Sequence, residues 1–210
     1  HFALGSLFRR RGEVDRALRM HHNLVDRADL DDSKRQQAIF ELAQDYLKAG
    51  ILDRAESLFS ELEGTPYAKQ ALEFLLELYQ KEHDWLKAIA VTQRLDAVSG
   101  QSHAKQAAFF YCELAGDEIA QDNPSAAREH LQQALRDCPN AVRATMMLGD
   151  MAVSEGKLEE AIAIWKNIED QDAQYLLLVA ERLLNAYRAL DRQADGVALL
   201  REYLGKYHSL

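Results

Sequence analysis

The sequence predicts an all-α fold, a right-handed α-solenoid of about six helix–turn–helix repeats. Three observations lead to this prediction. The stretch 42–62 has apolar residues at helical spacing on both sides of Gly50, a residue that can end a helix in the left-handed conformation. A small residue recurs along the chain where the two helices of such a unit must cross, and a leucine that opens the unit recurs with it.

The period of these residues identifies the type of repeat. The small residue recurs in steps of 38, 33, 39, 34 and 35 residues, at Ala17, Ala55, Ala88, Ala127, Ala161 and Gly196. The opening leucine recurs at Leu4, Leu42, Leu75, Leu114, Leu148 and Leu183. A helix–turn–helix unit of about 34 residues is the tetratricopeptide repeat. We therefore expect one array over 1–210, with units at approximately 1–31, 36–69, 70–102, 108–141, 142–175 and 177–210.

The six units keep the pattern to different degrees. The aromatic partner of the first helix is Phe8, Tyr46, Tyr79 or Tyr187 in four units, and Glu118 and Ala152 replace it in the fourth and fifth. The turn residue is glycine at Gly12, Gly50 and Gly156, and it is replaced by His83, Asp122 and Asp191. The segments 26–33 and 97–103 coincide with the two longest steps, so we expect them to be loops between repeats.

The charge of the chain excludes one class of partner. A net charge of −9 argues against nucleic acid, because phosphate neutralisation needs a basic face. Arg9, Arg10 and Arg11 form the one local exception. Two interpretations stay open for this cluster. It is either a solvated helix end or a membrane-proximal patch near anionic phospholipid, where each basic residue contributes ~1 kcal/mol.

No catalytic or metal motif is present, so we expect a non-enzymatic protein without a cofactor in this chain. The seven histidines include no HExxH pair, and no glycine-rich phosphate loop or GxSxG elbow occurs. Cys112 and Cys138 form no CxxC pair and are expected to be free thiols. No apolar run approaches the ~20 residues that span a bilayer. The chain starts and ends within the repeat pattern, so we expect a fragment of a longer protein.

Protein recognition remains as the expected activity. In solenoids of this type the first helix of each unit lines the concave groove, which is the usual binding surface. The main groove candidates are Phe40, Gln44, Glu73, Glu77, Phe109, Met146, Asp150, Glu181 and Arg188. The same rule adds Phe2, Ser6, Arg9, Leu47, Gln70, Gln80, Cys112, Ile119, Arg143 and Asn185.

The mixture of groove residues favours some partners over others. Repeat modules that clamp the C-terminal carboxylate of chaperones present lysine, arginine and asparagine at these positions. Here the third unit has Glu73 and Glu77, and the second has Phe40 and Gln44, so that clamp is absent. An apolar and acidic groove is suited to a folded protein surface or an amphipathic segment.

Three stretches resemble a known family. The opening FALGSLFRRRGEVDRAL at 2–18, the run 22–54 and FYCELA at 110–115 resemble lipopolysaccharide assembly protein B of Gram-negative bacteria. The resemblance implies an N-terminal membrane anchor, cytoplasmic tetratricopeptide repeats and a C-terminal rubredoxin-like domain that holds iron or zinc by two CxxC pairs. Neither the anchor nor a CxxC pair occurs in this sequence, so the chain would be the repeat portion alone.

The resemblance also implies a function. Such a protein is an adaptor at the cytoplasmic face of the inner membrane, where it brings an LpxC-type deacetylase, the committing enzyme of lipid A synthesis, to the FtsH-type protease. The repeat fragment itself would be soluble. Two alternatives stay open: a repeat scaffold of another cell-envelope or secretion pathway, and an enzyme that carries these repeats as an accessory. The sequence makes no prediction of oligomeric state.

Overall fold

The computed structural model describes residues 1–208, and these form helices and turns without any strand. Two compact units divide the chain, residues 1–103 and 104–210. In the first unit the helices are α1 (Phe2–Arg10), α2 (Val14–Val25), α3 (Asp32–Lys48), α4 (Leu52–Glu61), α5 (Ala68–Glu82) and α6 (Trp85–Ser99). In the second they are α7 (Ala104–Ala120), α8 (Pro124–Asp137), α9 (Val142–Ser154), α10 (Leu158–Lys166), α11 (Ile168–Gln171), the 3₁₀ turn η1 (Ala173–Tyr175), α12 (Leu176–Ala189) and α13 (Gln193–Lys206).

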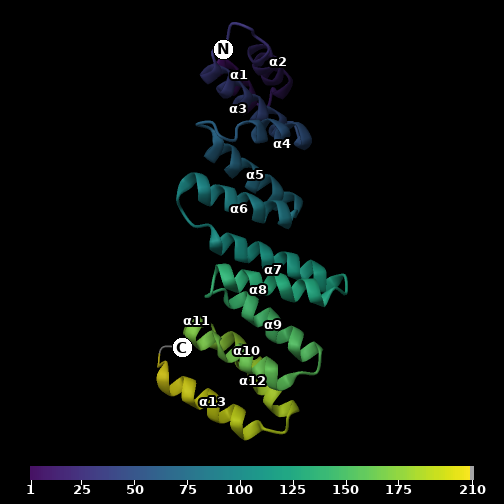
Figure 1. Ribbon diagram of the computed structural model, residues 1–210, viewed down its shortest axis with the longest axis vertical. Coiled ribbons are helices and arrows are strands. Elements are labelled where there is room, and N and C mark those ends of the chain that lie inside the picture. The colour runs from purple at the N-terminus through teal and green to yellow at the C-terminus, as the bar shows by residue number, and fades with distance from the viewer. Residues whose placement is uncertain (209–210) are drawn as a thin grey trace. The chain divides into compact units, whose positions relative to one another are not determined.

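The predicted fold class is confirmed. Within each unit the long helices form three helix–turn–helix pairs, and each helix packs against the next one in the chain (Figure 1). The short α11 and η1 are additions to this plan, since α10 ends at Lys166. Asp172 then adopts an extended backbone, and its carboxylate accepts a hydrogen bond from the Gln174 amide at 3.0 Å, which starts η1.

Both long linkers are shorter than predicted. Helix α3 begins at Asp32, within the predicted loop 26–33, because the Asp31 carboxylate caps it by accepting from the Lys34 amide at 2.7 Å. Helix α6 continues to Ser99, within the predicted loop 97–103, and Gly100 ends it at φ 68°.

Small residues allow the two helices of a pair to cross closely. The five alanines predicted at the crossings have no exposed surface, and Gly196 is also buried. A side chain at Gly196 would place a Cβ 3.1 Å from the Tyr187 ring. The predicted crossings are therefore confirmed, and they fix the register of each pair.

One core position sets the first pair apart. The residue 17 places after the opening leucine is Phe59, Thr92, Leu131, Trp165 or Leu200 in the later pairs, and it is His21 in the first. The rings of His21 and Trp165 occupy the space that a Cβ would need at Gly5 and Gly149, respectively. In these two repeats glycine directly after the opening leucine makes room for the ring, whereas the second repeat combines Phe59 with Ala43.

The opening leucines are not all in the core. Leu42, Leu75 and Leu183 are buried, but Leu4 is 43% exposed, which corrects the expectation for the first repeat. Leu7 is equally exposed on the same helix. The core side of α1 is formed by Gly5, which lies against His21.

Candidate protein-binding surfaces

The predicted groove residues all lie on the first helix of their pair. Phe40 and Gln44 are on α3, Glu73 and Glu77 on α5, Phe109 on α7, Met146 and Asp150 on α9, and Glu181 and Arg188 on α12. Their environments differ strongly, because some are held in side-chain networks and others are open to solvent. The two units are therefore described one at a time.

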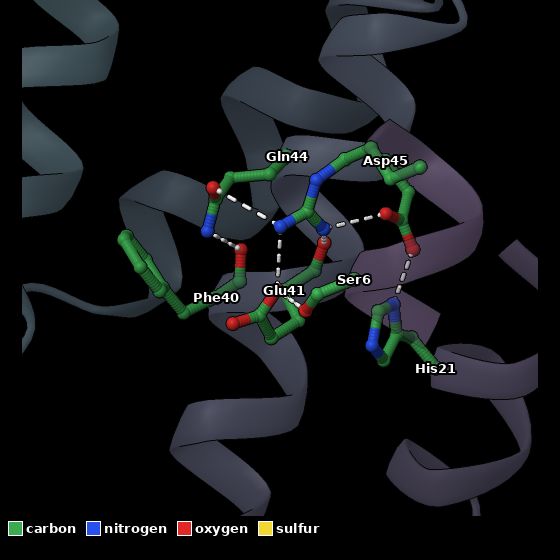
Figure 2. A network of polar contacts seen from close by, with 7 residues as sticks. Ser6, His21, Phe40, Glu41, Gln44 and Asp45 are labelled. Atoms are coloured by element: carbon green, nitrogen blue, oxygen red, sulfur yellow. Dashed lines mark hydrogen bonds and ion pairs between the residues drawn. The ribbon is translucent and has the colours of Figure 1, made fainter. Parts of the chain in front are cut away.

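In the first unit, Arg9 is the centre of a polar network between α1 and α3 (Figure 2). Its guanidinium donates to the Asp45 carboxylate at 2.7 Å and to the Glu41 carboxylate at 2.7 Å. It also donates to the Glu41 carbonyl at 3.1 Å and to the Gln44 side-chain oxygen at 3.4 Å. Ser6 donates to the same Glu41 carboxylate at 3.0 Å.

The network continues inward to a buried histidine. His21 Nδ1 lies 2.5 Å from Asp45 Oδ2, and neither side chain has any exposed surface. The ring of Phe2 stacks on His21 with centroids 6.5 Å apart. His21 Nε2 is buried and has no hydrogen-bond partner among the described residues. Asp45 thus bridges a cation and a histidine in the interior.

The hydrogen-bond partners of Arg9 stabilise its positive charge. Burial alone would lower the pKa of the guanidinium, but the hydrogen bonds to Asp45 and Glu41 outweigh it and raise that pKa. The Arg9 side chain is only 16% exposed. Its place in the predicted membrane-proximal group is therefore corrected, because the side chain points into the network. Arg10 and Arg11 are exposed and have no ion-pair partner among residues 1–208.

Phe40 belongs to an aromatic cluster and is not an open anchor. Its ring lies 5.1 Å from Tyr67, 6.2 Å from Phe59 and 5.8 Å from Phe74, measured between centroids. Phe59 and Phe74 stack in turn at 5.2 Å. Phe40 is consequently half-buried. The cluster joins α3 and α4 to α5, so a change at Phe40 would alter packing as well as surface.

The three glutamate candidates lie in solvent. Glu73, Glu77 and Glu181 are exposed, as is Arg188. Glu77 pairs with Lys81 at 3.3 Å one helical turn away, a contact of the kind that contributes little in water.

The second unit contains an open cavity of about 400 Å³, which we call the α7–α9 cavity. Its walls are the start of α7, the start of α9 with the loop before it, and the α11–η1 segment. The lining residues are Lys105, Ala108, Phe109, Cys112, Cys138, Asn140, Ala141, Val142, Arg143, Gln171, Asp172 and Tyr175. The structure thus brings together three predicted groove residues, Phe109, Cys112 and Arg143.

Aromatic and cationic side chains lie together at this cavity. Phe109 is 48% and Tyr175 is 42% exposed. The Arg143 guanidinium lies 5.4 Å from the Phe109 ring centroid, and its Nη1 pairs with Glu113 at 2.6 Å. An exposed aromatic ring beside a cation is the combination that dominates many protein interfaces.

Several functional candidates here were not predicted from the sequence. Lys105, Tyr175 and Gln171 were missed because they lie at helix starts or in the α11–η1 segment, outside the spacing rule for groove residues. His21 and Asp45 were also missed. Their signal was present, since histidine replaces an apolar residue at a core position and aspartate stands three places after a core leucine.

A smaller hollow of about 370 Å³ lies between α9, α10 and α12. Arg182 crosses its edge and binds both carboxylate oxygens of Asp150, at 2.9 and 3.3 Å. Trp165 forms part of the wall and donates to the Met146 carbonyl at 3.2 Å. Met146 itself packs against the core of the unit. Asp150 is thus already paired, and Met146 is partly buried.

The residues present do not fit the metal site that the resemblance implies. Cys112 and Cys138 are free thiols, and two cysteines cannot supply two CxxC pairs. Within residues 1–208 no group of three or more histidine, cysteine, aspartate or glutamate residues is placed to hold a metal ion. Burial raises the pKa of the Cys112 thiol to about 11.

Comparisons with known proteins agree with the repeat pattern. A tetratricopeptide repeat family model matches residues 112–175. Lipopolysaccharide assembly protein B of Escherichia coli is 35% identical over 202 residues, which is 96% of this chain. Lipopolysaccharide assembly protein B is thus a homologue of this chain. The homologue of the same name from Haemophilus influenzae is 34% identical over 190 residues, 90% of the chain. The chain spans about half the length of these relatives, 52% and 48% respectively.

Solved structures were also matched. The MamA protein of Desulfovibrio magneticus superposes with a TM-score of 0.42 and 17% identity, over 82% of this chain and 93% of that one. At this score the match is partial, and the fold assignment rests on the helix pairs and the sequence similarity. No helix in the part of the chain that the structure describes is long and apolar enough to cross a membrane.

Proposed function

We propose that this chain is the partner-binding part of an adaptor that controls lipopolysaccharide synthesis. The observation that carries the proposal is its 35% identity over 202 residues to lipopolysaccharide assembly protein B. The repeat fold supports it, because such arrays act by holding other proteins on an extended surface. The repeats take no part in catalysis in this proposal, and the iron or zinc site of the family lies outside this chain.

The proposal extends to specific partners. The adaptor presents an LpxC-type deacetylase to an FtsH-type membrane protease at the cytoplasmic face of the inner membrane. It acts by raising the local concentration of the substrate near the protease, which needs no new catalytic group. The α7–α9 cavity is our candidate for the contact, since Phe109 and Arg143 are both accessible there.

A capture assay tests this function. The chain is immobilised, and the purified deacetylase and the cytoplasmic part of the protease are titrated over it separately. The double variant Phe109→Ala with Arg143→Gln should weaken binding of at least one partner by about tenfold, because a truncated hot spot costs ~2 kcal/mol or more.

A matched control removes an equally exposed pair elsewhere. Leu204→Ala with Arg201→Gln changes an exposed leucine and an exposed arginine on α13, and binding should stay within about twofold of the unmodified chain. If neither protein binds the unmodified chain at micromolar concentration, the assignment of these partners is wrong. A repeat scaffold of another envelope or secretion pathway would then be the better description.

The exposed end of α1 suggests how the chain approaches a membrane. Arg10 and Arg11 lie on α1 and at its end, near the exposed Leu4 and Leu7, and we propose that they approach anionic lipid. The double variant Arg10→Glu with Arg11→Glu should weaken co-sedimentation with phosphatidylglycerol vesicles at low salt, since each basic residue contributes ~1 kcal/mol. The control Arg188→Glu with Arg201→Glu reverses two exposed charges on other helices. If both double variants lost vesicle binding equally, the proposal that Arg10 and Arg11 form a specific lipid contact would be refuted.

A further inference from the structure

The α7–α9 cavity lies where two helices begin. Lys105 is the second residue of α7, and Arg143 is the second residue of α9. The N-terminus of a helix carries partial positive charge, so natural sequences favour acidic residues in the first turn. Neither helix has one there. Both helices therefore carry a cation where it is unfavourable, and the two cations line one cavity.

This arrangement contrasts with the rest of the unit. Residues 104–210 contain 11 basic and 17 acidic side chains, a net charge of −6. Of the acidic groups at the cavity, Glu113 pairs with Arg143 at 2.6 Å, whereas the Asp172 carboxylate accepts a hydrogen bond from the Gln174 amide at 3.0 Å and keeps its negative charge. Lys105 has no ion-pair partner among the described residues, and Arg143 has donors beyond the Nη1 that Glu113 uses. The lining has two cations, Lys105 and Arg143, and one carboxylate, Asp172, so its balance is positive within an acidic unit.

The rest of the lining is apolar. Ala108, Cys112 and Val142 are buried in the wall, and the partly exposed rings of Phe109 and Tyr175 stand beside them. A volume of about 400 Å³ is within the range of pockets that bury a small ligand or a few side chains. One further wall residue, Gln171, has a buried side-chain oxygen without a donor among the described residues. An apolar wall beside two cations is suited to a ligand with both properties.

We propose that the α7–α9 cavity binds an extended segment of a partner protein in which a large apolar side chain stands beside an aspartate or glutamate. The apolar side chain packs between Phe109 and Tyr175. The carboxylate accepts hydrogen bonds from Arg143 and Lys105, and the partial charges of the two helix N-termini favour it further. This inference rests on the proposed function, since it names the chemistry by which such an adaptor selects a partner.

Capped peptides test the chemistry directly. The probes are acetyl-Gly-Phe-Glu-Gly-amide, the same peptide with Gln in place of Glu, and the same peptide with Ala in place of Phe. Each is titrated into the isotope-labelled 210-residue chain and followed by amide NMR. The first peptide should shift resonances at the starts of α7 and α9 and bind about fivefold or more tightly than either of the other two. Equal binding of the Glu and Gln peptides would overturn the proposal.

Variants of the chain supply the matched test. Lys105→Gln with Arg143→Gln should abolish the preference for Glu over Gln, and the control Arg201→Gln should keep it. Phe109→Ala should weaken all Phe-containing peptides about equally. A preference that survives the double cation variant overturns the proposal. So does tighter binding of acetyl-Gly-Gln-Phe with a free C-terminal carboxylate, because the occupant would then be a chain end.

The peptide titration and the partner capture can fail separately. If the deacetylase or protease binds the chain and the peptides show no carboxylate preference, the cavity chemistry is wrong and the adaptor function stands. If the peptides behave as expected and neither protein binds, the named partners are wrong and the cavity chemistry stands.

Discussion

A single residue ends the first helix in every pair of the array. Gly12, Gly50 and Gly156 occupy the left-handed region there, with φ of 82°, 76° and 75°. His83, Asp122 and Asp191 adopt the same conformation in the other pairs, with φ of 55°, 59° and 56°. A residue with a Cβ pays ~1–2 kcal/mol for this conformation, and glycine does not. Three turns of the chain are therefore strained at one position.

Glycine at the two strained aspartates should stabilise the second unit. Asp122→Gly and Asp191→Gly each remove the strain of a Cβ in the left-handed conformation. Part of this stabilisation is lost, because glycine also raises the conformational entropy of the unfolded chain. We expect each to raise the free energy of unfolding by about 0.5 kcal/mol, measured as a higher urea midpoint. His83 is a poorer test because its ring stacks on Trp85. The reverse change Gly156→Ala should lower the midpoint, and a rise in all three variants would contradict the argument.

The two thiols should differ in reactivity. Cys112 is 1% exposed, and burial raises its pKa to about 11, while Cys138 is half-buried. At pH 8 a disulfide reagent should modify one thiol per folded chain quickly, because the thiolate is the nucleophile. Cys138→Ser should remove the fast phase, and Cys112→Ser should leave it. Rapid modification of both thiols in the folded chain would show that the cavity wall opens.

The same shift gives a pH dependence of stability. The Cys112 pKa is raised above its ordinary value of 9.0. The stabilisation of the folded chain that goes with this shift is therefore fully present below pH 9. This stabilisation is lost progressively as the pH rises toward about 11. Cys112→Ala should flatten this part of the stability curve.

The environments of the core residues could be predicted from the sequence better than those of the polar residues. Alanines at the crossings were predictable because small size and period act together, and all five are fully buried. The environment of Arg9 was not predictable, because its partners Glu41 and Asp45 come from another repeat. Phe40 was predicted as a groove anchor, but it packs into a cluster with Tyr67 from the end of its own repeat and Phe74 from the next one.

Among the elements, α1 and α2 are joined to α3 by charged side chains as well as by packing. The contacts run from Arg9 on α1 and His21 on α2 to the fully buried Asp45 on α3. A buried ion pair is not by itself strongly stabilising, since desolvation offsets the attraction. Removal of one partner is costly, because the others remain buried without compensation.

A double-mutant cycle should reveal this coupling. Asp45→Leu should destabilise the first unit by about 3 kcal/mol, because the buried His21 loses its hydrogen-bond partner and Arg9 loses one of its two carboxylate partners. His21→Phe with Asp45→Leu should cost at least about 1 kcal/mol less than the sum of the single changes. Hydrogen exchange of the α1–α3 amides measures both effects. Asp15→Leu changes an exposed acid on α2 and serves as the control. Additive costs would show that the histidine and aspartate act independently.

At the scale of the whole molecule, the chain consists of two units of three helix pairs each. Each unit has its own buried residues, and each repeat depends chiefly on its neighbours. The predicted helix pairs were readable from the period, whereas the division after His103 was not, because the spacing pattern continues through it.

Each unit should fold alone. Residues 1–103 and 104–210, expressed separately, should both give helical circular dichroism spectra and cooperative urea transitions. The second unit should also retain the peptide binding of the full chain, because all residues of the α7–α9 cavity belong to it. A random-coil spectrum for either half would show that it depends on the other.

The pairing of His21 with Asp45 has a consequence for repeat engineering. Tandem repeats are commonly treated as interchangeable modules that can be duplicated, deleted or shuffled. At the position of Asp45 the third, fifth and sixth repeats have Leu78, Met151 and Ala186. A copy of the first repeat placed before any of these would set a histidine against a hydrocarbon neighbour. The fourth repeat has Asp117 at this position. The order of the repeats therefore matters, because the first repeat can be grafted only before a repeat that supplies this aspartate.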